Sequence, residues 1–268
     1  MKLLTLNCHA WHEENQTEKI RYLAETIKEK NYDVIALQEV NQSISAALNY
    51  RDIKKDNYGI VLLEELEKLG MTDYSFVWSF SHLVYGIYEE GVALLTKHPI
   101  LAEDSFVVSQ STDINYWKTR KIVGIQIDYQ GAPLSFYSCH MGWWTDEEEP
   151  FKLQADSLLQ QAKKEVPFFL MGDFNNSASL SGEGYDYLIS QDLHDTYELA
   201  EQKDQGTTVE GKITGWHDNK HDLRIDLVLT NRPFQVLSSN VIFNNRNKSI
   251  VSDHFGVEVE MLIPGISE

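Results

Sequence analysis

The sequence predicts an α/β fold in which two stacked, mixed β-sheets carry helices on their outer faces. Short apolar runs recur along the 268 residues, whereas only a few segments repeat apolar residues at helical spacing. The chain opens with a strand, a helix and a second strand, an order that favours neighbouring strands in one sheet. We find no proline-rich linker, low-complexity tract or short repeat. Residues 1–268 are therefore expected to form one domain.

The first three elements are the most regular part of the pattern. Residues 3–8 predict a strand, residues 17–30 a helix and residues 33–37 a second, buried strand. The helix carries one apolar stripe, formed by Ile20, Leu23, Ala24 and Ile27. Asn15 and Glu18 have the spacing of a capping-box variant, so we expect them to cap the first turn.

The rest of the chain predicts mainly strands. Residues 41–70 are polar and then become helical from about Leu62. Further strands are expected at residues 76–79, 90–96, 106–109, 121–129, 134–139, 225–230 and 256–262. Pro150 is expected to open a helix that runs to about Lys164. A short helix is expected at residues 185–190, and a loop at residues 207–215.

The stretch VPFFLMGDFN, residues 166–175, is the centre of the prediction. Its apolar part shows no polar alternation, as is typical of a strand buried on both faces, and it ends at Gly172. On an extended chain Asp173 and Asn175 share one face while Phe174 packs on the other. A carboxylate beside a carboxamide at a strand end suits a site that holds a water and a charged oxygen. A simple turn is the alternative, since Gly, Asp and Asn are common turn residues.

Composition limits the classes of partner. The formal net charge is -18, with 23 Lys and Arg against 41 Asp and Glu, so tight nonspecific binding of nucleic acid is not expected. The apolar part of the amino-terminal MKLLTLNCHAW is too short for a signal-peptide core, and no stretch approaches the roughly 20 apolar residues of a membrane span. These features favour a cytoplasmic protein without a transmembrane segment. Two cysteines, Cys8 and Cys139, imply no disulfide framework.

Polar residues stand at the ends of most of the apolar runs. They are Asn7, Glu39, His140, Asp173, Asn175, Asp226, Asp253 and His254. Each has a structural alternative: a turn residue, a hydrogen-bonded core histidine, a carboxylate at a helix start, or for Asp226 an ion pair with Arg224. Their repeated position favours an active site, because a rigid sheet fixes geometry at its strand ends.

These residue types suit metal-assisted hydrolysis. The sequence has no zinc-binding Cys/His spacing, no HExxH motif and no glycine-rich phosphate loop. Carboxylates and carboxamides are hard oxygen ligands, which favour Mg²⁺, with Mn²⁺ as the alternative. Histidines add acid–base groups near neutral pH. Together they predict attack of water on a phosphate ester.

Seven motifs carry a resemblance to the endonuclease/exonuclease/phosphatase superfamily, whose fold is that of DNase I. In order they are LNCHAW from Leu6, LQEV from Leu37, EEGVALLTKHPI from Glu89, CHMG from Cys139, GDFN from Gly172, RIDLVL from Arg224 and SDHFGV from Ser252. The resemblance runs over residues 6–257. It is greatest to sphingomyelinase-like members and, through NCHAW and HMGWW, to the RgfB-like group of Gram-positive bacteria. It implies a four-layer α/β sandwich, with the site where the strand ends of both sheets meet.

The resemblance also implies roles for single residues. Glu39 is the principal metal ligand, with Asn7 beside it and Asp253 as a further carboxylate on the metal side. Asp173 activates the nucleophilic water and Asn175 contacts a phosphoryl oxygen. His254 pairs with Asp226, and His140 stabilises the phosphate from the other side. Glu90 is implied as the partner of His140, and Arg120 as a phosphate contact or, alternatively, an ordinary charge at a strand edge.

The sequence departs from the family pattern near its fourth motif. Cys139 replaces the more usual Thr, and strand alternation predicts that Cys139 and Cys8 both point into the core. Trp143 and Trp144 follow, and they are expected either to line a pocket for a base, choline or sugar or to form a packed rim. We see no aromatic hairpin near the carboxy terminus of the kind that secreted sphingomyelinases use on membranes.

These features predict a monomeric Mg²⁺- or Mn²⁺-dependent phosphodiesterase or phosphomonoesterase that acts on a small-molecule or lipid-derived phosphate ester. A DNA nuclease of the same fold is the alternative, and such an enzyme should carry a basic groove. A non-catalytic binding or signalling module is a third hypothesis. It is disfavoured because every expected site position is filled. The substrate itself depends on loops that catalytic motifs do not describe.

Overall fold

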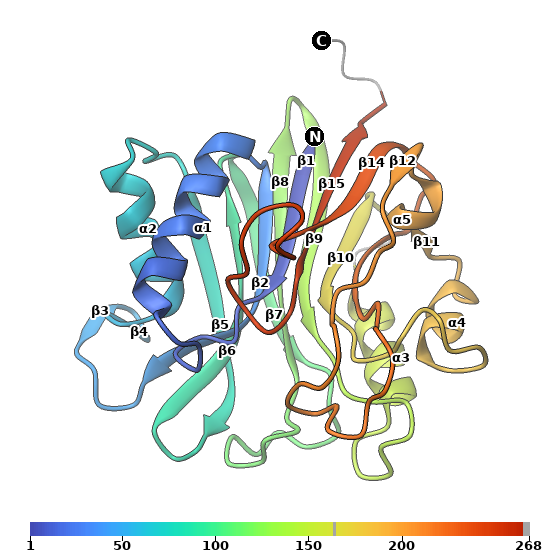
Figure 1. The fold of residues 1–268 in the computed structure, drawn as a ribbon, viewed down its shortest axis with the longest axis horizontal. Helices are drawn as coiled ribbons and strands as arrows, with labels where there is room; N and C mark the ends of the chain where they lie inside the picture. The colour runs from blue at the N-terminus through green and yellow to red at the C-terminus, as the bar shows by residue number, and fades with distance from the viewer. Residues whose placement is uncertain (163–164, 265–268) are drawn as a thin grey trace.

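Two β-sheets stack face to face, and helices cover their outer faces, so the protein is a four-layer α/β sandwich (Figure 1). The computed structural model describes residues 1–162 and 165–264. Helices α1 (Gln16–Lys30) and α2 (Tyr58–Lys68) lie on the first sheet. Helices α3 (Phe151–Gln161) and α4 (Gly184–Ile189) lie on the second. The fold class predicted from the sequence is confirmed.

The first sheet has seven strands within the described residues. Their order is β12-β14-β15-β1-β2-β6-β5. Strand β1 runs parallel to β2 and antiparallel to β15. The bounds are β1 (Lys2–Asn7), β2 (Val34–Ser43), β5 (Ser75–Val84), β6 (Tyr88–Thr96), β12 (Gln202–Lys203), β14 (Gln235–Ile242) and β15 (Gly256–Leu262).

The second sheet has six strands in the part of the chain that the structure describes. Their order is β11-β13-β10-β9-β8-β7, and β9 and β10 are parallel neighbours. The bounds are β7 (Ile100–Val107), β8 (Lys121–Tyr129), β9 (Ala132–His140), β10 (Phe168–Asp173), β11 (His194–Asp195) and β13 (Asp226–Thr230). A short helix, α5 (Thr196–Leu199), follows β11, and the pair β3 (Leu48–Tyr50) and β4 (Ile53–Lys54) forms a separate hairpin.

The main core lies between the two sheets. Alternate side chains of each sheet meet there, among them Leu3 and Ala36 from the first sheet and Phe136 and Met171 from the second. The opposite faces of the same strands bury the helices, so central strands such as β10 are buried along their whole length. This double burial explains the unbroken apolar run at residues 166–171. None of the helices in the described residues is long and apolar enough to cross a bilayer.

Helix α1 buries the predicted stripe but does not use the predicted cap. Ile20, Leu23 and Ala24 are fully buried. Asn15 adopts a left-handed conformation with φ of 54°, and its side chain makes no capping hydrogen bond. The Oε1 atom of Gln16 instead accepts from the backbone N–H groups of Trp11 and Glu13, which fixes the turn before the helix. The capping-box prediction is therefore wrong.

Several predicted boundaries move for identifiable reasons. Strand β2 continues to Ser43 because a bulge between Leu37 and Val40 lets the chain pair again with β6. Helix α2 starts at Tyr58, ahead of the predicted Leu62, because Asn57 caps it by accepting from Gly59 N–H. Strand β7 starts at Ile100 rather than at residue 106. The last turn predicted for the α3 helix includes residues 163–164, which lie outside the described residues.

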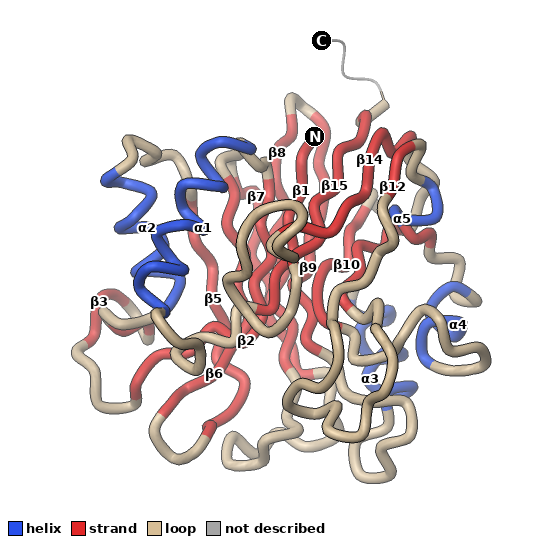
Figure 2. The backbone as a smooth tube through the Cα atoms, viewed as in Figure 1, coloured by secondary structure: helices blue, strands red, loops and turns tan. Residues whose placement is uncertain are grey.

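The functional site lies at strand ends, and two features of the fold help to form it: the inward-facing cysteines and the gathering of loops at one end of the sheets. Both cysteines are fully buried and free, as predicted, so the side chains that flank them in the sequence face the other way. Loops gather at the end of the two sheets that lies away from the amino terminus, which is the lower end in Figure 2. The carboxyl ends of β1, β9 and β10 run toward this end.

Candidate active site

Three polar side chains lie in one row across the second sheet. In the strand register, Asp173 at the end of β10 is opposite His140 of β9 on one side and Asp226 of β13 on the other. Residues directly opposite one another on neighbouring strands present their side chains on the same face. All three are at least nine-tenths buried, at 1% exposure for both aspartates and 9% for His140. The sheet therefore brings a histidine and two carboxylates together without help from a loop.

The first sheet contributes Asn7 and Glu39. Asn7 is the last residue of β1, and its Nδ2 donates to Glu39 Oε1 at 2.9 Å and to Asp173 Oδ2 at 3.2 Å. Glu39 lies in the β2 bulge with φ of 52°, a conformation that few non-glycine residues adopt. The bulge turns the Glu39 carboxylate out of the sheet and toward the polar row. Asn7 thus joins the two sheets at their shared end.

Asp173 and Asn175 share one side of the chain through a tight turn. The backbone N–H of Asn175 donates to Asp173 Oδ1 at 2.8 Å, while Phe174 packs fully buried on the other side. Asn175 has φ of 50°, so the chain turns here rather than staying extended. The prediction that Phe174 faces away holds, and the turn offered as its alternative is present as well.

His254 completes the row from the segment before β15. Its Nδ1 lies 3.0 Å from Asp226 Oδ2, and its Nε2 lies 3.8 Å from Asp173 Oδ2. Ser252, two residues earlier, donates its hydroxyl to the backbone carbonyl of Asn7 and so ties this segment to the end of β1. Arg224 pairs with Asp195 at 2.7 Å rather than with Asp226, the ion pair that the sequence offered as an alternative. Asp226 pairs with His254 instead.

The two histidines have opposite charge states. Burial lowers the pKa of His140 well below its usual value, and the nearby Arg120 guanidinium lowers it further, so His140 is neutral. Burial also acts to lower the pKa of His254, but Asp226 and Asp173 raise it well above its usual value. Burial, together with Asp226 and Glu39, raises the pKa of Asp173 despite the opposing charge of His254. The row thus holds one imidazolium and one neutral imidazole beside a carboxyl group that binds a proton readily.

These groups form the floor of a pocket of about 550 Å³. One wall is apolar and comes from the tip of the β5–β6 hairpin, including Leu83 and Tyr85. Trp117 and Trp143 form a second wall, with their ring centroids 6.0 Å apart. The remaining lining residues are His9, His12, Glu39, His82, Val84, Glu90, Arg120, His140, Asp173, Asn175, Thr214, Gly215, His217 and His254.

Comparison with known proteins identifies the fold and the family. The sequence profile of the Endonuclease/Exonuclease/phosphatase family matches residues 10–254. This chain belongs to the endonuclease/exonuclease/phosphatase family. It is similar to the family protein from Leptotrichia buccalis C-1013-b, at 47% identity over 98% of this chain and 100% of that one, with a TM-score of 0.92.

More distant structures share the fold. A mannosyl-6-phosphatase from Bacteroides thetaiotaomicron VPI-5482 is 17% identical over 98% of this chain and 100% of that one, with a TM-score of 0.70. A humanized D. rerio TDP2 is 14% identical over 98% and 99%, with a TM-score of 0.63. No curated protein matches the chain in sequence. Members of the endonuclease/exonuclease/phosphatase family hydrolyse phosphate esters, as phosphatases or as nucleases.

The family's divalent cation fits the carboxylates at the pocket floor. Glu39 lines the pocket, and its charge acts to raise the pKa of three other buried carboxyls: Glu90, Asp173 and Asp253. Carboxylates that repel one another are the type of oxygen donor that a hard cation neutralises. The Oδ1 atom of Asn7 accepts from His9 N–H at 3.2 Å, so ligation by Asn7 requires that oxygen to turn toward the ion.

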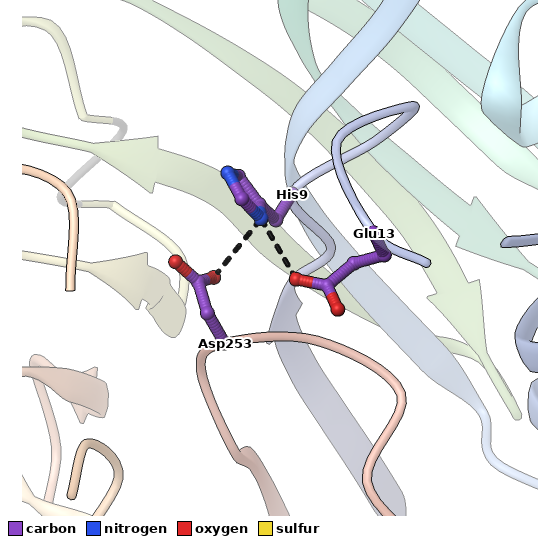
Figure 3. A group of neighbouring side chains, drawn as sticks. All are labelled: His9, Glu13 and Asp253. Atoms are coloured by element: carbon purple, nitrogen blue, oxygen red, sulfur yellow. Dashed lines mark hydrogen bonds and ion pairs between the residues drawn. The ribbon is translucent and has the colours of Figure 1, made fainter. Parts of the chain in front are cut away.

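Asp253 takes part in a separate cluster with His9 and Glu13. His9 Nδ1 lies 2.8 Å from Glu13 Oε1 and 3.6 Å from Asp253 Oδ1 (Figure 3). Lys19 also pairs with Glu13. Burial acts to lower the pKa of His9, but the neighbouring carboxylates raise it above its usual value. Burial acts to raise the pKa of Glu13, but His9 and Lys19 lower it to about 2. The cluster is therefore charge-balanced, because His9 and Lys19 lie beside the carboxylates of Glu13 and Asp253.

Two predicted substrate contacts differ from their expected geometry. Glu90 faces His82, with Oε1 3.4 Å from Nε2, whereas His140 lies 3.9 Å from Glu39 and 3.7 Å from Asp173. The predicted pairing of Glu90 with His140 is thus replaced by one with His82, because Glu90 lies beside His82 in the β5–β6 register. Trp144 packs against Phe151 and Tyr187 in the helix-covered core, so it is part of the packed rim that the sequence left as an alternative.

Arg120 and Trp143, for each of which the sequence left two alternatives open, both line the pocket. Arg120 is 4% exposed and lines the cavity. Its Nη1 donates to the backbone carbonyl of Trp117, and its Nε has no hydrogen-bond partner among the described residues. A buried guanidinium with an unused N–H is suited to an anionic ligand.

Several residues of the site were not predicted, among them the pocket-lining His9, His82 and Trp117, and Trp216, which contacts Asn175. His9 stands in LNCHAW two residues after Asn7, so its spacing could have marked it as a site residue. Trp117 and His82 lie on loops and hairpins whose path no local pattern reveals. Trp216 lies in a polar segment, and only its tertiary contact with Asn175 connects it to the site.

Proposed function

We propose that this protein is a divalent-metal-dependent phosphoesterase that hydrolyses a small-molecule or lipid-derived phosphate ester by attack of water. One observation carries the proposal. Four side chains converge on a single oxygen, Asp173 Oδ2, at the floor of the pocket. Asn7 Nδ2 and Asn175 Nδ2 donate to it at 3.2 Å and 3.3 Å. His140 Nε2 and His254 Nε2 lie 3.7 Å and 3.8 Å from it. A carboxylate surrounded by such donors can position a water and accept its proton while the same donors contact a phosphoryl oxygen.

In this mechanism, Asp173 orients the attacking water and takes its proton. The water oxygen bonds to phosphorus, and the bond between phosphorus and the ester oxygen breaks. His254 donates from Nε2 to the phosphoryl oxygen on which negative charge develops. Asp226 accepts from Nδ1 and, by its charge, keeps the His254 ring protonated. His140, Asn175 and Arg120 hold the phosphoryl group from the other side of the pocket. All of these groups are positioned before substrate binds, so little reorganisation is needed.

The metal ion would bind to Glu39, with Asn7 and Asp253 as further candidates. Bound there, a Mg²⁺ or Mn²⁺ ion supplies charge neutralisation and stabilises the leaving oxygen. Glu39→Gln keeps the side-chain shape and removes the negative charge. We expect calorimetry to give an affinity for Mn²⁺ at least about tenfold weaker than that of the unsubstituted protein. Unchanged affinity would remove Glu39 from the metal site.

The substrate class follows from the walls of the pocket. Trp117, Trp143 and Tyr85 offer aromatic and apolar surface for the organic part of a small ester. The sphingomyelinase-like and RgfB-like resemblance supports a lipid-derived or small headgroup. The fold neighbours named mannosyl-6-phosphatase and TDP2 support the fold alone at this distance. Nuclease activity remains the alternative within the same family.

The test is a hydrolysis screen with Mg²⁺, Mn²⁺ or a chelator, across phosphomonoesters, phosphodiesters, sphingomyelin and DNA with an abasic site. We expect metal-dependent turnover of a small ester, and a loss of about 10²-fold or more in Asp173→Asn. The exposed Asp73→Asn is the matched control, and circular dichroism melts check folding. Near wild-type turnover by Asp173→Asn would contradict the mechanism, and turnover of DNA alone would favour a nuclease.

A further inference from the structure

One loop over the pocket contacts the catalytic floor through the side chain of Trp216. The segment between β12 and β13 places Thr214, Gly215 and His217 on the pocket wall. Trp216, between them, donates its indole Nε1–H to Asn175 Oδ1 at 2.9 Å. Its ring packs on a small apolar cluster formed by Val209, Leu223 and Ile225 at the base of the loop. The Trp216 side chain thus anchors the loop in two ways, by packing on this apolar cluster and by its hydrogen bond to Asn175.

Three contacts, of which the Trp216 bond is one, favour a single orientation of the Asn175 amide. Its Nδ2 donates to the backbone carbonyl of Met141 at 3.0 Å and to Asp173 Oδ2 at 3.3 Å. An amide turned by 180° would set its oxygen against that carbonyl and the Asp173 carboxylate. It would also set its NH₂ group against the indole N–H of Trp216, which can only donate. Trp216 therefore reinforces, from the oxygen side of the amide, the orientation in which the NH₂ group faces Met141 and Asp173.

We propose that Trp216 is a positioning residue for hydrolysis: it holds the Asn175 amide in its catalytic orientation and couples that orientation to the loop that contacts the substrate. The proposal rests on the phosphoesterase function proposed above. Its basis is that neighbouring residues of one short loop line the pocket while Trp216 holds an amide on the pocket floor. Contact of the organic part of a substrate with residues 214–217 then favours turnover rather than binding alone.

The packing of Gly215 supports this coupling. Gly215 has φ of 83°, and a Cβ atom there would lie 2.7 Å from Trp143 Cζ2. The loop backbone therefore rests directly on a ring that lines the pocket. A substrate that moves Trp143 moves the backbone next to Trp216. Asn175, Trp216, Gly215 and Trp143 thus form one continuous set of contacts from the floor to the wall.

The first test is Trp216→Phe, which keeps an aromatic ring and removes the N–H. We expect kcat to fall about tenfold, with KM changed less than threefold and the melting temperature nearly unchanged. Asn175→Ala and the double variant complete the cycle. If Trp216 acts through Asn175, the double variant is no slower than Asn175→Ala alone. Losses that multiply, or a Trp216→Phe enzyme within twofold of wild type, would overturn the proposal.

A second readout does not depend on activity. The side-chain NH₂ resonances of Asn175, assigned by their disappearance in Asn175→Asp, should shift or broaden in Trp216→Phe because the amide loses its orienting partner. Gly215→Ala should shift them too, although residue 215 does not bond to Asn175. Unchanged resonances in both variants would overturn the proposal. If wild type hydrolyses no phosphate ester yet the resonances shift, the function fails while the positioning contact stands.

Discussion

A side chain at position 172 has no room, because its Cβ atom would lie 1.9 Å from the carbonyl oxygen of Cys139. Gly172 also has φ of 150°, which side-chain-bearing residues rarely adopt. The close approach of β10 to β9 at this point sets Asp173 opposite His140. The glycine of the GDFN motif, Gly172, therefore allows β10 to approach β9 closely enough to place Asp173 opposite His140.

We expect Gly172→Ala to destabilise the protein by more than about 3 kcal/mol, since backbone atoms rather than a flexible side chain must move. Thermal or urea unfolding measures this loss. Gly86→Ala is the matched control, because Gly86 also has positive φ, of 68°, but its Cβ would meet nothing within 4 Å. The control should lose only about 1 kcal/mol. Equal losses in the two variants would contradict the steric explanation.

The pair of His254 and Asp226 gives a second prediction at the scale of single residues. Asp226→Asn removes the charge that keeps His254 protonated, so it and His254→Ala should each lower kcat/KM, by about 10²-fold. The double variant should lose little more than His254→Ala alone, because both changes remove the same imidazolium. The measurement is turnover of the substrate found by the screen, with melts as the fold control. Fully multiplicative losses would show that the two residues act independently.

Sequence reasoning found the groups on the pocket floor because they stand beside apolar strands in recognisable motifs. Asp173, Asp226 and His140 come from strand ends whose register brings them together. Partners that depend on side-chain direction across strands were not readable: Glu90 was expected with His140 and faces His82. Trp216 and Trp117 depend on the path of loops, and no local periodicity fixes that path.

Strand β2 illustrates what a local pattern misses at the scale of elements. Its apolar run stops before Gln38, so a strand end was expected there, yet pairing with β6 resumes at Val40 after the bulge. Gln38 is fully buried and donates to Ser138 Oγ at 3.0 Å, which links the two sheets just beneath the site. A buried polar residue such as Gln38 interrupts the apolar run, so the sequence pattern reads it as the end of a strand. Boundaries of β2 and β7 shifted for such tertiary reasons, whereas β8 matched its clear alternation.

The other end of the sheet gives a prediction for pH dependence. The Asp33 carboxylate accepts from the Lys2 backbone N–H at 2.7 Å and from His98 Nε2 at 2.8 Å, with Lys97 Nζ 3.4 Å away. Burial acts to raise the pKa of Asp33, but these partners lower it below its usual value. A carboxyl group with a lowered folded-state pKa stabilises the protein above its unfolded-state pKa. That contribution is lost as pH falls through the folded-state pKa.

Asp33→Asn should therefore be less stable than wild type at pH 7, by about 1–2 kcal/mol, because two charge-assisted hydrogen bonds are weakened. The difference should begin to shrink as pH falls below about 4, the unfolded-state pKa, and should be lost as pH falls through the lower folded-state pKa. Denaturant unfolding at several pH values measures it, with the exposed Asp73→Asn as the control. A stability difference that stays constant from pH 7 to pH 3 would mean that the charge of Asp33 contributes nothing.

At the scale of the whole molecule, charge separates the two candidate substrate classes. The net charge is -18, and Arg120 is the one Lys or Arg among the described residues that line the pocket. Lys118, beside Trp117, is paired with Asp146 at 2.7 Å and with Glu148 at 2.6 Å. Arg120 is buried inside the cavity, where it can reach one phosphoryl group but cannot track a nucleic-acid backbone. The charge distribution thus favours a single small anion over a polyanion.

We therefore expect weak binding of duplex DNA at physiological salt, with a dissociation constant well above micromolar and a log–log salt slope close to zero. Fluorescence anisotropy with a labelled duplex and the Asp173→Asn variant, in Mg²⁺, measures binding without cleavage. Asp146→Lys with Glu148→Lys is the positive control: it reverses two charges beside Lys118 and should strengthen binding and steepen the salt dependence. Submicromolar, strongly salt-dependent binding by the protein without these two changes would reverse the ranking and favour a nuclease. Weak binding that the lysine variants do not improve would instead mean that the shape of the rim, rather than its charge, excludes the duplex.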